Sequence, residues 1–418
     1  MPTGGLRELE GRFVAVRGTT ERLAEPLSPE DCTVQSMPEA SPVKWHLAHT
    51  SWFFETFVLE AGERGYRAFH PRFRVLFNSY YNAVGAQHPR PERGMVSRPS
   101  LAEVRSYRQH VDAHVRELFA RGAVDGVLAD RIELGLHHEQ QHQELVLTDV
   151  KHMLSLNPLE PAYRSLPSTP ASDPTAVRWV RHPGGVVSIG HEGISFCFDN
   201  ERPRHRVLVE PFALASRLVT NGEFLEFIAD GGYRRPEVWL AEGWDAVRSG
   251  GWAAPLYWRN DEGMWRTMTL SGGREVRRDE PVCHVSFYEA DAFARWVGAR
   301  LPSEAEWEVA AEGAAVDGNL LESGLLHPAP LSSSGSAPLG QLFGDVWEWT
   351  RSSYAPYPGF RAEPGALGEY NAKFMCSQLV LRGGSCATPR SHVRPTYRNF
   401  FPPNARWQFS GLRLARDG

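Results

Sequence analysis

The sequence is poor in cysteine, has no long apolar run and carries no excess of positive charge. Its five cysteines are scattered over 418 residues without a CxxC pair, so neither a disulfide framework nor a cysteine-based zinc site is predicted. No run approaches the roughly 20 apolar residues of a membrane span, and residues 1–10 are polar and charged, unlike a signal peptide. We therefore expect a cytoplasmic protein with reduced thiols and no membrane partner.

A net charge of −5 at pH 7 provides no basic surface of the kind that binds nucleic acid, so no nucleic-acid partner is expected. No internal repeat is found, and Gly344–Trp349 lacks the lysine that a phosphate-binding loop needs. Hydrophobic residues make up 42% of the chain, as in ordinary globular proteins, and the length predicts two or three domains.

Four segments in the first part of the chain carry apolar residues at spacings of three or four, the pattern of amphipathic helices. They are Leu6–Leu23, Trp45–Phe57, Ala102–Arg121 and Val124–Leu156. An antiparallel four-helix bundle is the simplest arrangement for residues 1–156, and the cores of such bundles often hold metal ions. Residues 157–176 are rich in proline, serine and threonine, which predicts a linker.

Residues 177–418 change to short β-like runs and turns, such as Gly185–Gly190 and His205–Val209. Only three helices are expected there: Asn221–Ala229, Ser286–Val297 and Ser303–Glu312. The aromatic-rich remainder predicts a domain held together by packed loops, with little regular sheet. The expected fold class is α+β, with a helical bundle at 1–156, a linker at 157–176 and a second domain at 177–418.

The fourth predicted helix carries His138 and His142, four residues apart. Residues at that spacing share one helix face and can present two nitrogens to one metal ion. A third ligand must come from elsewhere, and the second helix offers His46 and His49. The pair could equally be surface or hydrogen-bonded core groups, but the density of polar residues from His137 to Gln143 in an otherwise apolar helix favours a metal site.

The segment Phe77–Gly94 is too rich in glycine, proline and asparagine for a helix, yet too aromatic for a solvent-exposed loop. Its paired tyrosines, Tyr80 and Tyr81, and two arginines, Arg90 and Arg93, could bind and protonate a small anionic substrate. The alternative is a loop that is simply fixed by buried aromatic rings. The residues alone leave both interpretations open.

Five motifs of the second domain resemble, in order, the formylglycine-generating-enzyme (sulfatase-modifying-factor) fold, which is a C-type-lectin-like domain. They are Asp199–Pro203, Val219–Phe224, Arg300–Glu308, Gly344–Trp349 and Leu381–Ser385. Trp45–His49 and His138–His142 resemble the metal-binding helices of the DinB-like four-helix bundle. Over nearly the whole chain, the two domains in this order resemble the ergothioneine-biosynthesis sulfoxide synthases.

This resemblance implies a mononuclear non-haem iron(II) enzyme. Members of the family use O2 to couple a thiol to the imidazole C2 of hercynine, which is Nα-trimethylhistidine, and so form a sulfoxide. The positions that match the three iron-binding histidines are His49, His138 and His142, a donor set that suits iron(II). His46 is the runner-up, or a group that supports a ligand from behind. Gln141 matches the family glutamine that contacts the hercynine imidazole.

The catalytic acid divides the family. Mycobacterial-type members use a tyrosine from the C-terminal domain, whereas a second type places a tyrosine pair from the bundle-side loop near the iron. Tyr80 and Tyr81 match that pair, and Phe400 and Phe401 stand where the mycobacterial type has tryptophan and aspartate. The resemblance therefore assigns the chain to the non-mycobacterial type, with Tyr80 or Tyr81 as the acid and Tyr397 as the next candidate.

The resemblance also places Asn399, Phe400 and Phe401 in the pocket for the betaine group of hercynine. A quaternary ammonium favours aromatic faces, which suits the two phenylalanines. The alternative for Phe400 and Phe401 is simple core packing.

The thiol donor of the family is either cysteine or γ-glutamylcysteine. Phe401 and Ala405 replace an aspartate and an arginine of the mycobacterial-type pocket, and the loss of these charges favours cysteine, the smaller donor. Arg90 matches a family arginine and could hold the cysteine carboxylate, with Arg93 and Arg398 as substitutes.

Three alternatives remain at the level of function. A selenoneine-forming homologue shares both domains and hercynine but uses a selenosugar. A formylglycine-generating enzyme relies on a pair of active-site cysteines, and here only Cys386 follows Gly383–Ser385. A non-catalytic ligand-binding protein would leave the histidines of the bundle unexplained.

Overall fold

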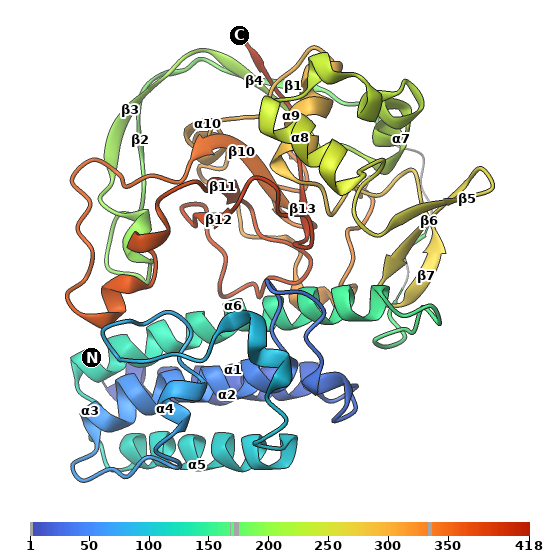
Figure 1. Cartoon of the computed structure of the whole chain (residues 1–418). Coiled ribbons are helices and arrows are strands. Elements are labelled where there is room, and N and C mark those ends of the chain that lie inside the picture. Colours follow the sequence, from blue (N-terminus) through green and yellow to red (C-terminus); the bar gives the residue numbers. More distant parts are fainter. Residues whose placement is uncertain (1–2, 168, 171–174, 333–336) are drawn as a thin grey trace. The chain divides into compact units, whose positions relative to one another are not determined.

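The computed structural model describes residues 3–167, 169–170, 175–332 and 337–418. The chain divides into two compact units, which Figure 1 draws. The first is Met1–Leu159 with Pro364–Tyr370, and the second is Glu160–Glu363 with Asn371–Gly418. The first is helical and the second is mainly strands and loops, which confirms the predicted α+β class. Among the described residues, no helix is both long and apolar enough to cross a membrane.

Four long helices build the first unit and confirm the four predicted helical segments. They are α1 (Thr3–Ala24), α2 (Val43–Phe54), α5 (Leu101–Ala120) and α6 (Gly126–Ser155). Capping side chains mark two of the starts, because they satisfy N–H groups that have no partner within the helix. Ser100 accepts the N–H of Glu103 at 3.3 Å, and Asp125 accepts that of Leu128 at 2.8 Å.

Helix α2 is the central helix of this unit. It packs against α5 and α6, and all of its 12 residues are buried. After Phe54 it widens into a π-helical turn, Glu55–Leu59, and ends in the short α3 (Glu60–Gly62). The Glu55 carboxylate accepts hydrogen bonds from the hydroxyls of Tyr66 and Tyr107 at 2.7 and 2.6 Å, which tie the turn to the loop after α3 and to α5.

The aromatic segment 77–94 is a packed loop that follows the short α4 (Phe73–Leu76). Asn78 fixes its turn from both sides. Its side-chain amide donates to the carbonyl of Tyr81 at 3.0 Å, and its side-chain oxygen accepts the N–H of Tyr81 at 3.1 Å. The tyrosine pair is thereby held by the backbone as well as by its rings.

A distant stretch of the chain, Pro364–Tyr370, completes the first unit. Its residue Glu369 accepts the backbone N–H groups of Asn82 and Ala83 at 3.0 and 2.8 Å. The carboxylate therefore holds the loop directly after the tyrosine pair. The prediction that this stretch belongs to the second domain is therefore wrong, because no local pattern of residues indicates that it belongs with the helices.

The second unit consists of short strands in small sheets, whose order follows from the pairings. One sheet joins β1 (Trp179–His182), β4 (Phe212–Ala215) and β14 (Ala415–Asp417), and another joins β12 (Asn399–Phe401), β11 (Leu379–Arg382), β10 (Trp347–Ser353) and β13 (Ser410–Gly411). The others pair β2 (Gly185–Ile189) with β3 (His205–Val209), β5 (Trp258–Asp261) with β6 (Met264–Thr269) and β7 (Gly272–Glu275), and β8 (Gly318–Asn319) with β9 (Phe343–Gly344). All pairs are antiparallel except β10 with β13 and β8 with β9.

Helices α7 (Asn221–Ala229), α9 (Phe287–Trp296) and α10 (Glu304–Ala310) confirm the three predicted for this unit. Helix α8 (Ala241–Gly250) was expected to be irregular, and that expectation is wrong. Its 10 residues include two glycines and give the apolar pattern less than three turns in which to repeat.

The core of the second unit combines aromatic rings with buried ion pairs. Trp307, Trp347 and Trp349 are at most 1% exposed. Arg413 donates to both oxygens of Glu348 at 2.9 and 3.0 Å, and both side chains are completely buried. Buried charges of this kind are tolerated only when they are paired and hydrogen-bonded, so these pairs fix the loops where regular sheet is scarce.

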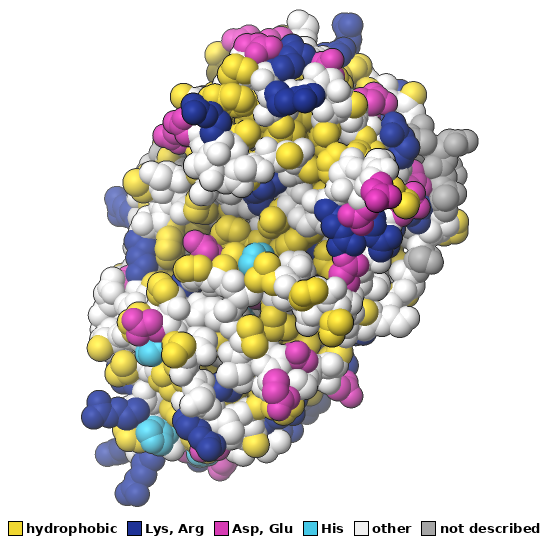
Figure 2. Space-filling model, turned by 45° about the vertical axis from the view of Figure 1, so that its right-hand side comes forward, with side chains coloured by type: hydrophobic (Ala, Val, Ile, Leu, Met, Phe, Trp, Pro, Cys, Tyr) yellow, Lys and Arg dark blue, Asp and Glu magenta, His cyan; other side chains and the backbone are white. Residues whose placement is uncertain are grey.

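Part of the predicted linker, residues 157–176, lies outside the described residues, namely 168 and 171–174. Of its described part, Tyr163 is only 4% exposed, and its N–H donates to the carbonyl of Leu270 at 2.9 Å. This portion therefore packs on the second unit. On the face that Figure 2 shows, Lys and Arg side chains are interspersed with Asp and Glu and form no continuous basic surface.

Candidate metal centre

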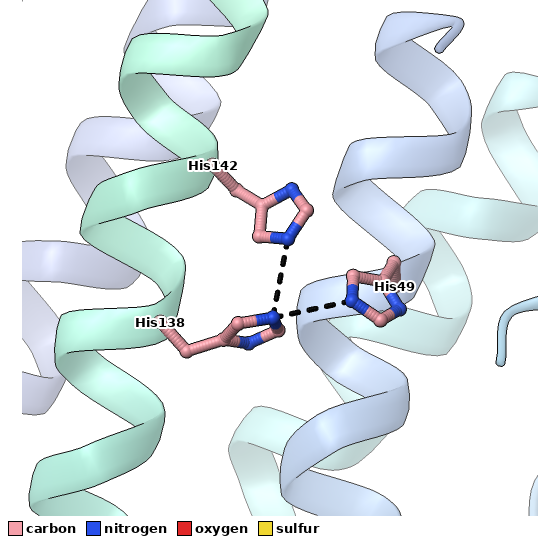
Figure 3. Close-up of side chains that lie close together, drawn as sticks. All are labelled: His49, His138 and His142. Carbon is pink, nitrogen blue, oxygen red and sulfur yellow. Dashed lines mark hydrogen bonds between the residues drawn. The ribbon is translucent and has the colours of Figure 1, made fainter. Parts of the chain in front are cut away.

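Three imidazoles from two helices meet in the core of the first unit. His49 comes from α2, and His138 and His142 come from α6 (Figure 3). Nε2 of His138 lies 3.2 Å from Nε2 of His49 and 3.1 Å from Nε2 of His142. The structure thus brings together the three histidines that the family resemblance indicated, and all three are buried. Among the described residues, this is the one group of histidine, cysteine or acidic side chains with the spacing of a metal site.

Hydrogen bonds behind the rings orient two of the three imidazoles. Nδ1 of His49 lies 2.6 Å from the carbonyl oxygen of Phe77. A carbonyl can only accept, so Nδ1 donates and Nε2 keeps its lone pair. Nδ1 of His142 lies 2.8 Å from Nδ1 of His46. Within the described part of the chain, Nδ1 of His138 has no hydrogen-bond partner.

Aromatic side chains enclose the histidines. Trp45 and Trp52, on either side of His49 in α2, both stack on its ring, with centroid distances of 4.5 and 5.5 Å. Phe53 lies against the ring of His138 at 4.7 Å. These rings keep the imidazoles from rotating and exclude water, which strengthens any charge interaction inside the site.

Burial and mutual proximity keep the three imidazoles neutral. Burial lowers the pKa of His138 to about 3. The pKa values of His49 and His142 fall well below 6.5, first because of burial and then because His138 stands beside them. Near neutral pH, nitrogen lone pairs are therefore free to bind a cation. A set of three neutral imidazoles fits a divalent first-row metal ion, iron(II) included.

The tyrosine pair of the loop lies near this cluster. The rings of Tyr80 and Tyr81 stack at 4.7 Å, and Trp52 contacts both Tyr81, at 5.5 Å, and His49. Burial raises the pKa of both phenols above 10, and the neighbouring Tyr80 and Tyr370 raise that of Tyr81 further. Both hydroxyls therefore keep their protons at neutral pH and can act as hydrogen-bond donors.

A third tyrosine, Tyr370, reaches the same cluster from the 364–370 segment. Its ring lies 5.7 Å from that of His138 in an edge-on arrangement, and its hydroxyl donates to Oε1 of Gln141. Gln141, which the resemblance implies as a contact of the hercynine imidazole, thus lies next to both Tyr370 and the histidines. Sequence reasoning missed Tyr370, which stands 229 residues after Gln141. The one pointer to it was that some family members draw a tyrosine from the C-terminal domain.

The two arginines of the loop differ in how far they are buried. Arg90 is exposed and its guanidinium donates to the carbonyl of Glu39. Arg93 is only 4% exposed, lies 3.4 Å above the ring of Trp45 and donates to Oγ of Ser41 at 2.9 Å. Burial, followed by the charge of Arg90, lowers its pKa to about 9. No carboxylate of the described residues forms a salt bridge with Arg93, although the charge of Asp149 offsets part of this lowering of the pKa.

The other predicted substrate residues lie in the second unit. Asn399, Phe400 and Phe401 form β12, where Phe400 stacks on Tyr354 at 4.0 Å. Arg398 is 2% exposed and donates to Glu304 at 2.9 and 3.1 Å. Phe400 and Arg398 therefore both have contacts within the second unit.

Tyr397 is also buried in the second unit, with its hydroxyl 3.1 Å from Nε2 of His392. The structure therefore divides the predicted site residues between two groups. One group surrounds the histidines of the first unit, and the other belongs to the strand region around β12.

Comparisons with known proteins match the two parts of the chain to two different families. Residues 12–146 match the DinB superfamily, and residues 165–418 match the sulfatase-modifying factor enzyme 1-like domain. Fold and site thus define a two-domain protein in which a DinB-type bundle with a three-histidine face precedes a domain of the sulfatase-modifying-factor type.

Full-length relatives narrow this class. The chain is 34% identical over 435 residues to the hercynine oxygenase of Mycobacterium tuberculosis, with 98% of this chain and 99% of that protein covered. It is also 34% identical over 443 residues to the hercynine oxygenase of Mycolicibacterium thermoresistibile, at 98% and 95% coverage. The chain belongs to the hercynine oxygenase family and is an oxidoreductase. This confirms the family expected from the motifs.

A formylglycine-generating enzyme of Streptomyces coelicolor is 31% identical over 298 residues, but it covers only 59% of this chain. The helical unit with its histidines is therefore what separates this protein from enzymes that consist of the second domain alone.

Proposed function

We propose that the protein joins hercynine to a thiol in an iron(II)- and O2-dependent reaction of ergothioneine biosynthesis. The thiol S–H and the imidazole C2–H are lost, a C–S bond forms, one oxygen atom enters the sulfoxide and the other leaves as water. The observation that carries the proposal is the convergence of Nε2 of His49, His138 and His142 in a buried, aromatic-lined site. The family relationship supplies hercynine as the substrate.

The three histidines would hold the iron. When bound, iron(II) would supply the redox chemistry for O2 and a binding position for the thiolate. The chain itself contributes neutral ligands, because burial keeps protons off the imidazoles, and a ring of Trp45, Trp52 and Phe53 that limits access of water. Gln141 stands next to His142 in α6 and would contact the hercynine imidazole.

The proton donor would be a tyrosine of the first unit. Tyr80 and Tyr81 remain the candidates from the sequence, and their assignment to the non-mycobacterial type rests on that pair. Tyr370 joins them because its hydroxyl is already hydrogen-bonded to Gln141. A positioned hydroxyl of this kind can deliver a proton during the reaction, which typically contributes about 100- to 10,000-fold to the rate.

Cysteine is the sulfur donor that the charges favour. The buried guanidinium of Arg93 can receive one carboxylate, and a charge-assisted hydrogen bond would compensate the cost of its burial. γ-Glutamylcysteine brings a second carboxylate, for which Arg90 is exposed and engaged with Glu39. A selenosugar brings no carboxylate that Arg93 could receive.

A formylglycine-generating activity finds less support. Cys386 is completely buried, and its backbone N–H donates to the carbonyl of Asp345 at 3.0 Å. A reactive cysteine needs an accessible thiolate in an electropositive setting.

Steady-state kinetics with iron-loaded protein test the proposal. At saturating hercynine and O2, kcat/KM is compared for cysteine, γ-glutamylcysteine and a selenosugar, with product identity read by mass spectrometry. We expect a sulfoxide and a preference for cysteine. A preference for γ-glutamylcysteine would overturn the assignment of the donor, and turnover with the selenosugar alone would reassign the enzyme.

A further inference from the structure

Behind His142 lies a chain of buried polar groups that the proposed reaction does not use. Nδ1 of His46 is 2.8 Å from Nδ1 of His142, and Nε2 of His46 is 3.0 Å from Oδ2 of Asp149. The same carboxylate oxygen accepts the backbone N–H of Ser41 at 2.8 Å. His46 and Asp149 are only 2% and 6% exposed. A buried histidine and a buried carboxylate are costly to retain without a purpose or a compensating network.

The helices bring these groups together through their periodicity. His142 and Asp149 are seven residues apart in α6 and therefore lie on one face, two turns from each other. His46 and His49 are three residues apart in α2, so that His46 can reach the back of His142 while His49 faces His138. The same two helices thus provide both the converging nitrogens and the groups behind one of them.

The carboxylate of Asp149 determines the direction of each hydrogen bond from Asp149 through His46 to His142. An ionised Asp149 can only accept, so Nε2 of His46 must donate to it. In neutral His46, Nδ1 then carries the lone pair and accepts from Nδ1 of His142. In neutral His142, Nε2 in turn is left without a proton. This is the nitrogen that lies 3.1 Å from Nε2 of His138, on the side where the imidazoles converge.

We infer that His46 and Asp149 are positioning residues that set the tautomer of His142, so that its Nε2 presents a lone pair to the metal ion. The inference rests on the metal site of the proposed function. Without these hydrogen bonds, a neutral imidazole can hold its proton on either nitrogen. The tautomer with the proton on Nε2 cannot bind a metal at that atom. Ser41 adds a donor that keeps the carboxylate oriented.

Two substitutions of His46 separate this role from simple packing. His46→Phe fills the space but removes the acceptor behind His142. His46→Gln keeps the polarity, because its side-chain oxygen can accept from His142 while its amide donates to Asp149. Groups that support metal-bound histidines typically contribute about 10- to 100-fold to metal affinity. We expect a loss of that size for His46→Phe and recovery to within about threefold of wild type for His46→Gln.

Gln143→Leu is the matched control. Gln143 follows His142 in α6, is buried, and donates to the carbonyl of Val16 at 2.9 Å and to Oγ1 of Thr20 at 3.1 Å. Its loss weakens the same helix on a different face, so it should lower the melting temperature without changing metal affinity.

The test measures two quantities on the full-length protein. The first is the affinity for iron(II) and cobalt(II) under anaerobic conditions. The second is the tautomer of His142 in the metal-free wild type, read from long-range ¹H–¹⁵N couplings after selective labelling of histidine. We expect His142 protonated at Nδ1. Protonation at Nε2, or metal binding by His46→Phe as tight as by Gln143→Leu, would overturn the inference.

The tautomer is read on the wild type, so the test does not depend on whether His46→Phe folds. Neither readout requires turnover. Tight metal binding with the expected tautomer but no sulfoxide would refute the proposed function and leave this inference intact, whereas sulfoxide formation with the opposite tautomer would refute this inference alone.

Discussion

Two buried polar clusters on neighbouring faces of α6 differ in the groups that satisfy them. His138 faces two other imidazoles, whereas its neighbour Glu139 faces two arginines, Arg17 at 2.8 Å and Arg108 at 3.0 Å. Burial alone would raise the pKa of Glu139, but the two guanidiniums outweigh it and hold the pKa at about 2. The carboxylate cluster is complete within the chain. The histidine cluster has only imidazole–imidazole hydrogen bonds at its centre, and it is stable only if the groups stay neutral or a cation lies between them.

The comparison teaches how to distinguish a structural from a functional polar core. Glu139 also connects α1 and α5 to α6, and Arg108 donates to the carbonyl of Leu47 and to Oγ1 of Thr50 in α2 at 3.0 and 2.8 Å. This cluster therefore holds the four helices in register. That register brings His49 opposite His138, so the carboxylate cluster supports the histidine cluster.

Among these substitutions, the largest effect on activity is expected for the tyrosines near the histidine cluster. Replacing the proton-donating tyrosine with phenylalanine should reduce sulfoxide formation about 100- to 10,000-fold, while oxidation of the thiol to a sulfinate survives or rises. Tyr80→Phe, Tyr81→Phe and Tyr370→Phe are compared by product analysis.

Tyr107→Phe is the control for this series, because its hydroxyl donates to Glu55 and contacts no histidine of the site. It should lower stability and leave the ratio of products unchanged. If all three tyrosine variants gave the wild-type sulfoxide yield, the acid would lie outside the first unit, with Tyr397 as the next candidate.

Glu139→Ala is expected to lower the free energy of unfolding by about 3–5 kcal/mol, because it leaves two buried guanidiniums without their partner. His138→Gln in the metal-free protein should cost much less, since the glutamine amide can keep a hydrogen bond to a neighbouring imidazole and Nδ1 of His138 has no partner to lose. Urea denaturation of both variants without metal measures this difference. Equal losses would contradict the division into a cluster of paired charges and a cluster of neutral imidazoles.

Arg93→Met should raise the KM for cysteine about 10- to 100-fold with little change in kcat, the effect of losing one charge-assisted hydrogen bond to a bound substrate. Arg90→Met, which removes an exposed arginine of the same loop, serves as the control and should change KM far less. A selenosugar or hercynine KM that rose in parallel with that of cysteine would show that Arg93 acts through the fold of the site instead.

The smallest expected effect is the loss of stability at acidic pH. An unfolded imidazole takes up a proton below about pH 6.5, whereas His138 in the fold does so only near pH 3. Proton uptake therefore favours the unfolded chain in this window, and the stability of the metal-free protein falls as the pH drops from 6.5 towards 3. At pH 5.5, His138 accounts for about 1.4 kcal/mol of this loss.

Denaturation of wild type and His138→Gln at pH 7.5 and 5.5 measures the effect, and the variant should show the smaller decrease. A decrease of the same size in both would mean that His138 is not held neutral by the fold. For the same reason, iron should be released well below pH 6.5 and not near the pKa of a free imidazole.

The sequence was sufficient where function depends on local spacing. The four-residue interval of His138 and His142 predicted their shared face, and amphipathic spacing predicted the four helices. Spacing could not choose between His46 and His49 as the third ligand, since both lie on neighbouring faces of a helix that is buried all round. The structure separates them: His49 faces His138, and His46 stands behind His142.

Long-range placement could not be predicted. Glu369 and Tyr370 join the helical unit through contacts with residues more than 200 positions earlier in the chain, and no local pattern encodes such a contact. The same holds for Arg93, whose burial above Trp45 distinguishes it from Arg90 although both belong to one short turn.

The most direct test of the account is an anaerobic titration of wild type and His138→Ala with iron(II), followed by addition of hercynine, cysteine and O2. The account predicts one tightly bound iron per wild-type chain and a sulfoxide product, and neither in His138→Ala. Gln143→Leu, titrated in parallel, should behave as wild type. Stoichiometric iron and normal turnover in His138→Ala would contradict the central claim that the converging histidines of α2 and α6 form the catalytic metal site.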